Sequence, residues 1–154
     1  MEKTVNYELL AEQIRALAET APGPVPVMAN ASALLMDAME QVNWAGFYLV
    51  EEDHLIVGPF QGKPACVRIE KGRGVCGTAL GEDALQLVPD VHEFPGHIAC
   101  DAASRSEIVV PLHHEGGVVA VLDIDSPVKN RFSPEDARGL AAFAGVLEEV
   151  IRWK

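Results

Sequence analysis

Two pairs of apolar segments in the middle of the chain constrain the fold most. Trp44–Val50 and His54–Phe60 are rich in β-branched and aromatic residues, and three acidic residues separate them. Glu107–His113 and Val118–Ile124 repeat this arrangement around a turn that contains two glycines. Each pair is therefore predicted to form an antiparallel β-hairpin.

Helical patterns occupy the two ends of the chain. Apolar residues recur every three or four positions near the N-terminus, and a proline-rich segment from Pro22 to Pro26 is expected to separate two helices. Near the C-terminus a serine, a proline and an acid are spaced as they are at a capped helix start. The helices are predicted over Asn6–Ala21, around Ala29–Gln41, and from Ser133 to about Trp153.

Shorter elements lie between the two hairpins. Strands are predicted at Cys66–Ile69 and Leu85–Val88, with a short helix near Val75–Leu80 between them. Residues 89–104 show no periodicity, and a loop of this length is usually functional when it is as apolar as this one. The pattern predicts an α+β fold, an antiparallel sheet with the N- and C-terminal helices packed on a face, in one domain over residues 1–154.

The charge balance excludes two classes of partner. The 154 residues include 12 Lys and Arg against 23 Asp and Glu, a formal net charge of −11. Such a surface repels phosphate groups, so neither nucleic acid nor an anionic membrane is expected as a partner. No apolar run approaches the roughly 20 residues that cross a bilayer, and no signal-peptide core follows Met1, so we expect a cytoplasmic protein.

Three cysteines need an explanation, because an odd number does not describe a structural disulfide framework. Cys66, Cys76 and Cys100 could each be a small core residue, a metal ligand or a reactive thiol. Cys100 lies on the long loop, where reactive groups are often placed. A zinc site with His97 is one alternative, although the spacing matches no motif of paired C-x-x-C arms. Thiol redox chemistry, in which one cysteine attacks and another resolves, is the other.

Three acids and two aromatics are the remaining candidates for a site. Asp123 and Asp125 are two residues apart on a predicted strand and therefore point to the same face, and Glu107 begins another strand. The two aspartates either belong to a solvated strand end or an Asx turn, or they bind the ammonium group of an amino acid or hold a proton. Trp44 and Tyr48 also share one face, as core residues or as an apolar wall for a small ligand.

Six short strings along the chain are uncommon when taken together. They are NWAGFY (43–48), GPFQGKPAC (58–66), GRGVCG (72–77), FPGHIACD (94–101), SRSEIV (104–109) and LDIDSP (122–127). In this order they closely resemble the free methionine-(R)-sulfoxide reductases, enzymes with a GAF fold. The resemblance spans nearly the whole chain and includes all three cysteines of that family.

The resemblance implies a role for each cysteine. Cys100 would attack the sulfoxide sulfur, leaving methionine and a sulfenic acid. Cys66 would be the principal partner that converts the sulfenic acid to a disulfide, and Cys76 a further redox cysteine. An external dithiol such as thioredoxin would then reduce the enzyme, and no cofactor or metal is expected.

The resemblance also implies the substrate contacts. Trp44 and Tyr48 would form the apolar wall, and Glu107, Asp123 and Asp125 would hold the free amino acid. A non-catalytic GAF module that binds a small molecule and a zinc-stabilised interaction domain are the alternative functions. A homodimer, and which of the two other cysteines resolves Cys100, stay open at the level of the sequence.

Overall fold

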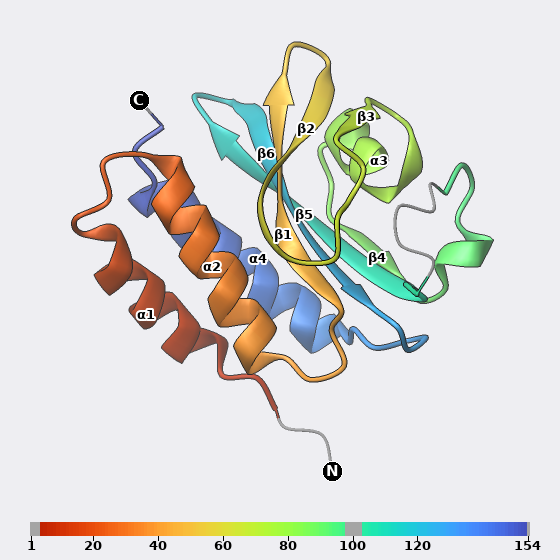
Figure 1. Cartoon of the computed structure of the whole chain (residues 1–154), viewed down its shortest axis with the longest axis horizontal. Coiled ribbons are helices and arrows are strands. Elements are labelled where there is room, and N and C mark those ends of the chain that lie inside the picture. Colours follow the sequence, from red (N-terminus) through yellow and green to blue (C-terminus); the bar gives the residue numbers. More distant parts are fainter. Residues whose placement is uncertain (1–3, 98–102, 154) are drawn as a thin grey trace.

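A six-stranded sheet forms the centre of the part of the chain that the computed structural model describes, residues 4–97 and 103–153. The strand order is β3-β2-β1-β6-β5-β4, and all neighbouring strands are antiparallel (Figure 1). The strands are β1 (Trp44–Glu51), β2 (His54–Gly62), β3 (Arg68–Glu70), β4 (Gln86–Val88), β5 (Ser106–His114) and β6 (Gly117–Ser126).

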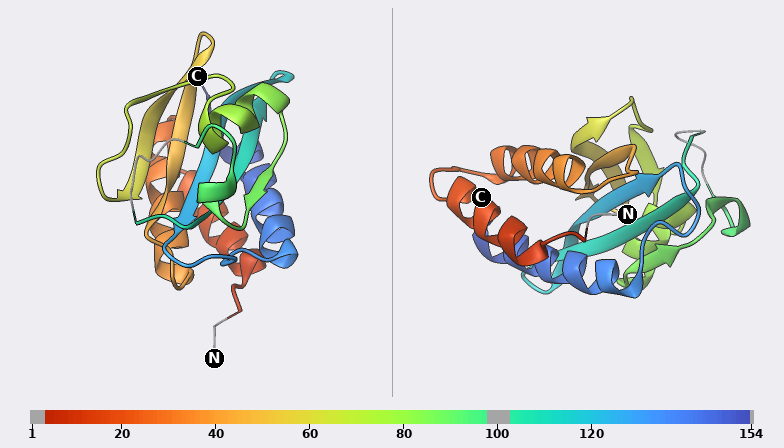
Figure 2. Two further views of the ribbon diagram at one scale, coloured as in Figure 1. Left: turned by 90° about the vertical axis from the view of Figure 1, so that its right-hand side faces the viewer. Right: turned by 90° about the horizontal axis from the view of Figure 1, so that it is seen from below.

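Three long helices cover one face of this sheet, and a shorter helix lies on the other (Figures 1 and 2). The described helices are α1 (Tyr7–Ala18), α2 (Pro24–Ala38), α3 (Gly74–Glu82), the short 3-10 helix η1 (Val91–Glu93) and α4 (Pro134–Val150). The helices α1, α2 and α4 form the main apolar core with the sheet, and α3 packs on the opposite face. The predicted α+β fold is therefore confirmed.

Pairing between β1 and β6 joins the two predicted hairpins into one sheet. Because side chains alternate along a strand, each strand contributes to both faces. On β1, Ala45 and Phe47 belong to the core under the three long helices, whereas Trp44 and Tyr48 belong to a second apolar cluster with α3. The sheet thus separates a purely structural core from a second face where a site can form.

The proline-rich segment separates two helices as predicted, but the second helix begins inside it. Helix α2 begins at Pro24 rather than near Ala29, and Pro26 lies within its first turn. The first N–H groups of a helix have no partner within the helix, so proline there removes no hydrogen bond. The prediction of a later start was wrong for this reason.

Other element ends differ by a few residues from the prediction. Asn6 is the N-cap of α1, its side chain accepting a hydrogen bond from the Leu9 backbone N–H, and the helix ends at Ala18. The last helix ends at Val150 rather than Trp153. The 3-10 helix η1 lies within the segment that was expected to be a plain loop.

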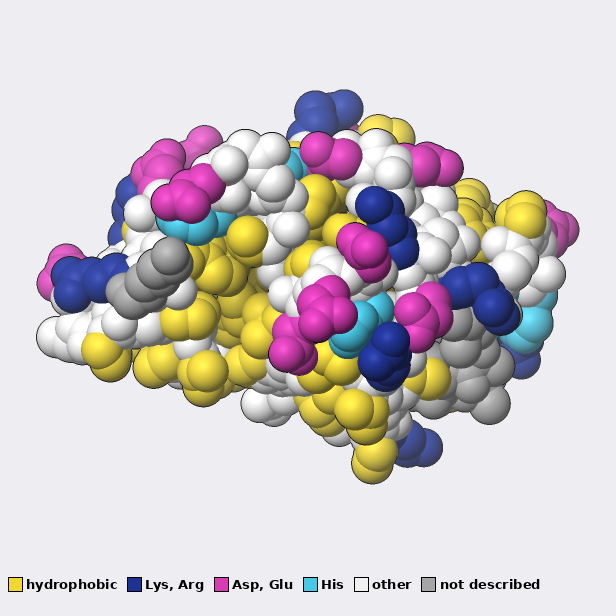
Figure 3. All heavy atoms as spheres, turned by 90° about the horizontal axis from the view of Figure 1, so that it is seen from above, with side chains coloured by type: hydrophobic (Ala, Val, Ile, Leu, Met, Phe, Trp, Pro, Cys, Tyr) yellow, Lys and Arg dark blue, Asp and Glu magenta, His cyan; other side chains and the backbone are white. Residues whose placement is uncertain are grey.

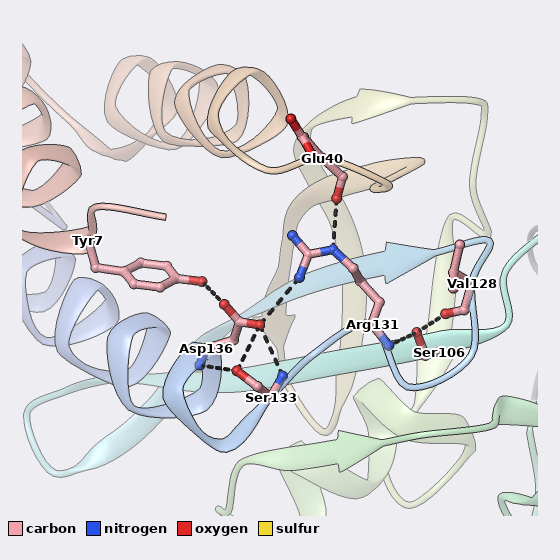
Figure 4. A network of polar contacts seen from close by, with 7 residues as sticks. All are labelled: Tyr7, Glu40, Ser106, Val128, Arg131, Ser133 and Asp136. Atoms are coloured by element: carbon pink, nitrogen blue, oxygen red, sulfur yellow. Dashed lines mark hydrogen bonds and ion pairs between the residues drawn. The ribbon is translucent and has the colours of Figure 1, made fainter. Parts of the chain in front are cut away.

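A polar network fastens the start of α4 to the rest of the molecule (Figure 4). Ser133 and Asp136 form the predicted capping box. The Tyr7 hydroxyl donates to Oδ1 of Asp136 over 2.7 Å, and the Arg131 guanidinium contacts Oδ2 of the same carboxylate over 3.3 Å. Arg131 also donates to the Glu40 carbonyl over 2.8 Å. The partly buried Asp136 carboxylate therefore links α1 to α4, and Arg131 connects it to the segment after α2.

The molecular surface agrees with the charge argument. On the face shown in Figure 3, acidic and basic side chains are interspersed, and the Lys and Arg side chains form no continuous stripe. No helix within residues 4–97 and 103–153 is long and apolar enough to span a bilayer.

Candidate active site

The candidate site lies on the sheet face opposite the three long helices. Strand pairing puts Trp44 of β1 directly beside Asp125 of β6, and Asp125 directly beside Glu107 of β5. Directly paired residues point to the same side of a sheet, so these three side chains form a row across three strands. Asp123 lies two residues before Asp125 on the same face.

A pocket forms where this row meets α3 and the loops around it. Six of the eight residues predicted for the site line this pocket, namely Trp44, Tyr48, Cys76, Glu107, Asp123 and Asp125. The other residues in its wall are Pro64, Ala65, Ile69, Arg73, Gly74, Val75, His97 and Ser104. Residues up to 81 positions apart in the sequence therefore share one cavity.

Stacked aromatic rings make one wall of the pocket. The Trp44 ring stacks on Tyr48 at 5.7 Å and on Phe60 at 5.0 Å between ring centroids. The Trp44 indole N–H donates to the Lys63 carbonyl over 3.1 Å, which fixes the orientation of the ring. Gly46 lies between Trp44 and Tyr48 on β1, and a Cβ atom there would lie 2.2 Å from Cβ of Phe60. A glycine is required at this position for β2 to bring Phe60 onto Trp44.

Three carboxyl groups lie beside these rings, on the neighbouring strands β5 and β6, in a desolvated environment. Glu107, Asp123 and Asp125 are only 8%, 4% and 9% exposed. Burial raises the pKa of Glu107 well above its usual value, and the negative charges of the two aspartates raise it further. Burial also raises the pKa of Asp123, although hydrogen bonds from Glu107, Asp125 and Cys76 oppose that shift. Because three close carboxylates cannot all ionise cheaply, this cluster holds a proton, most strongly at Glu107.

Cys76 brings a thiol into the same cluster. It lies in the first turn of α3, and its Sγ is 3.9 Å from Oε2 of Glu107. Burial raises the pKa of the Cys76 thiol, and the charges of Asp123, Glu107 and Asp125 raise it further. The same environment raises the pKa of Tyr48. Cys76 is therefore a protonated thiol here and lacks the electropositive surroundings of a nucleophilic cysteine.

The structure gives less information about Cys66 and Cys100 than about Cys76. Cys66 is half-buried and disulfide-bonded. Cys76 is a free cysteine. Cys100 lies outside the described residues, so its predicted roles as the attacking cysteine and as the partner of Cys66 remain predictions.

Several residues of the wall were not singled out from the sequence. Arg73 precedes α3 as its N-cap residue, and Ser104 accepts a hydrogen bond from the Asn43 side chain over 3.4 Å. His97, named from the sequence as a possible zinc ligand, lines the pocket, where burial lowers its pKa. Gly72 and Gly74, on either side of Arg73, have positive φ angles, and no sequence pattern indicated that this turn lies in the same pocket as the acids.

The zinc site weighed as an alternative from the sequence included Cys100, which lies outside the described residues, so that alternative is not tested. The described side chains that could share one metal ion are Cys76, Glu107 and Asp123, whose ligand atoms all lie within 4.8 Å of one another. Neither His97 nor Cys66 belongs to this group.

Comparison with known proteins gives consistent matches over the whole chain. Residues 29–152 match the family model of the GAF domain. Protein YtsP of Bacillus subtilis is 53% identical over 97% of this chain and 93% of its own length. The free methionine-R-sulfoxide reductase of Escherichia coli is 52% identical over 98% of this chain and 92% of its own.

Solved structures match equally well. The reduced form of fRMsr of Staphylococcus aureus superposes with a TM-score of 0.94 at 48% identity and covers 99% of both chains. The complex of that protein with its substrate has a TM-score of 0.92 at 47% identity, with the same coverage.

Proposed function

This chain belongs to the GAF domain family, among the free methionine-R-sulfoxide reductases, and we propose that it reduces free L-methionine (R)-sulfoxide to methionine. The observation that carries the proposal is the pocket in which three buried carboxyl groups lie beside stacked aromatic rings. An apolar wall suits the thioether end of the substrate, and an acidic wall suits its ammonium group. The substrate complex of the Staphylococcus aureus relative supports the assignment.

The pocket accounts for selectivity toward the free amino acid. Glu107, Asp123 and Asp125 offer acceptors to an α-ammonium group, which a methionine inside a polypeptide lacks. Trp44 and Tyr48 present ring faces against which the methyl group and sulfur pack. Because the acids and the aromatic rings line one pocket side by side, it suits a ligand that is small, charged at one end and apolar at the other.

Reduction begins with attack by a thiolate on the sulfoxide sulfur. In the proposed step, the Cys100 thiolate accepts the sulfoxide oxygen with one proton, and methionine leaves as the thioether with its sulfur reduced by two electrons. Cys100 then carries a sulfenic acid. Glu107 is the proposed source of the proton, because the buried cluster retains a proton there and excludes water.

A second thiol completes the catalytic cycle. The Cys66 thiol attacks the sulfenic acid, a disulfide forms, and the hydroxyl leaves as water. An external dithiol, for which thioredoxin is the proposed donor, then reduces the disulfide by thiol exchange. Cys76 is less suited to either attacking step because its environment favours the protonated thiol.

The test of this proposal is turnover of separated epimers. Purified protein is incubated with dithiothreitol and either the R or the S epimer of free L-methionine sulfoxide, and methionine is quantified by chromatography. Cys100→Ser tests whether Cys100 is the attacking thiol. Cys76→Ser shows the effect of removing a different thiol. Methionine from the R epimer alone, lost in Cys100→Ser, is the expected result. Tight binding without turnover by the wild type would instead indicate a sensor module.

A further inference from the structure

We propose that Cys76, Glu107 and Asp123 form a binding site for one zinc ion, separate in chemistry from the reduction described above. The thiol and the two carboxyl groups come from α3, β5 and β6, and they converge inside the pocket. This ligand set is not the histidine and cysteine combination that the sequence suggested. It arises only from the packing of α3 against the sheet.

The distances between the three groups suit a single ion. Zinc binds sulfur at about 2.3 Å and oxygen at about 2.0–2.2 Å, so a sulfur and an oxygen that share a tetrahedral ion lie roughly 3.6 Å apart. Sγ of Cys76 and Oε2 of Glu107 are already 3.9 Å apart. All three ligand atoms lie within 4.8 Å of one another, so small side-chain rotations complete the geometry.

One carboxylate oxygen of this group is buried without a hydrogen-bond partner. Oδ1 of Asp123 has no hydrogen-bond partner among the described residues, although the residue is only 4% exposed. No Lys or Arg of the described chain forms an ion pair with Asp123 or Glu107. A buried carboxylate oxygen without a partner is energetically costly, and a bound cation removes that cost.

The donor set selects the kind of ion. One thiolate with two carboxylates and an open position suits zinc, which accepts both sulfur and oxygen ligands. Calcium and magnesium prefer oxygen ligands only, and copper(I) prefers sulfur. On binding, an S–Zn bond replaces the S–H bond of Cys76 and an O–Zn bond replaces the O–H bond of protonated Glu107, and both protons pass to solvent. Since Glu107 and Asp123 also face the proposed substrate, zinc and substrate exclude each other.

Cobalt(II) absorption tests the site directly and does not depend on enzymatic activity. Protein reduced with a phosphine is titrated with Co²⁺, and a sulfur-to-cobalt charge-transfer band is expected to saturate at one equivalent. Zn²⁺ then displaces Co²⁺ and abolishes the band. Cys76→Ser removes the band, whereas Cys66→Ser, the matched control, keeps it.

Two further measurements keep the test decisive. Asp123→Asn is expected to retain the charge-transfer band but to weaken the affinity for Co²⁺ at least about tenfold, the equivalent of about 1.4 kcal/mol. Circular dichroism checks that each variant is folded. Persistence of the band in folded Cys76→Ser, loss of it in Cys66→Ser, or unchanged affinity in folded Asp123→Asn would each overturn the site. Inactivity toward methionine sulfoxide leaves this result unaffected and bears only on the proposed reduction.

Discussion

Sγ of Cys76 lies 3.9 Å from Oε2 of Glu107, although one residue belongs to α3 and the other to β5. Burial raises the pKa of both groups, so each holds its proton to a higher pH than it would in water. A site with this arrangement is suited to donating a proton and poorly suited to generating a thiolate at Cys76. An attacking thiolate is therefore expected from a cysteine other than Cys76.

Replacing the proposed proton donor should change the pH dependence of the reaction. Glu107→Gln is expected to lower kcat by about 10²- to 10⁴-fold, the usual contribution of a general acid. In the wild type, the rate should fall as pH rises through the raised pKa of Glu107, because the deprotonated form cannot donate. Single-turnover formation of methionine across the pH range measures this. Glu115→Gln, in the exposed turn between β5 and β6, is the control, and an unchanged profile in Glu107→Gln would contradict the assignment.

Recognition of the ammonium group can be separated from catalysis by acetylating the substrate. N-acetyl methionine sulfoxide loses a charge-assisted contact of roughly 1.5–3 kcal/mol, which corresponds to about 10- to 100-fold in kcat/KM. Asp125→Asn should impair the free amino acid far more than the acetylated form. Measurement of kcat/KM for both substrates on both proteins gives the answer. Equal turnover of the two substrates by the wild type would rule out ammonium recognition.

The identity of the resolving cysteine is open to a direct chemical test. One equivalent of sulfoxide, added to reduced protein without reductant, should produce a disulfide between Cys100 and Cys66. Acid quenching and peptide mapping by mass spectrometry detect it. Buried Cys76 is expected to remain a free thiol in the same sample. A link between Cys100 and Cys76, with Cys66 free, would reverse the assignment.

His113 provides a pH-dependent contribution to stability away from the site. Its ring nitrogens lie 2.5 Å from Oδ1 of Asp83 and 2.8 Å from Oε2 of Glu148, and hydrogen bonds to these acids raise its pKa. The stabilisation is therefore fully present below the unfolded pKa of about 6.5 and is lost as pH rises through the higher folded pKa.

The variant His113→Gln should show this effect in urea unfolding. At low pH its free energy of unfolding should be about 1 kcal/mol or less below that of the wild type, because both ion pairs are partly exposed and screened by solvent. Above the folded pKa the difference from the wild type should shrink. His114→Gln is the matched control, since the nearest oxygen of Glu115 is 3.6 Å away on a largely exposed side chain. A difference that grows with pH would contradict the prediction.

Two glycines on the same helix should respond in opposite ways to alanine. A Cβ atom at Gly139 would lie 2.1 Å from the Tyr7 ring, whereas nothing lies within 4 Å of one at Gly145. Gly139→Ala should destabilise the protein by about 1–3 kcal/mol, because α1 and the Tyr7–Asp136 hydrogen bond must shift. Gly145→Ala should stabilise it by roughly 0.5–1 kcal/mol through helix propensity. Thermal unfolding of both variants measures the difference, and equal effects would show that the contact at Tyr7 is not rigid.

Local patterns in the sequence were sufficient for most of the secondary structure and for which side chains share a strand face. Both hairpins, the terminal helices and the capping box at Ser133 follow from short-range rules, because alternation, helical periodicity and capping depend on neighbouring residues. The same alternation correctly placed Trp44 with Tyr48, and Asp123 with Asp125, on shared faces. The start of α2 was misjudged because proline breaks a helix interior but suits its first turn.

Sequence patterns alone therefore predict which side chains share a strand face and which family the motifs resemble. Only the tertiary structure decided that β1 pairs with β6, which puts Trp44 beside Asp125, and that α3 lays Cys76 against Glu107. Pairing between segments so far apart depends on the total apolar surface buried by the whole chain, which no local pattern encodes. The raised pKa values of Cys76 and Glu107 have the same origin, because they come from burial in a cavity that exists only after the sheet and α3 have packed together.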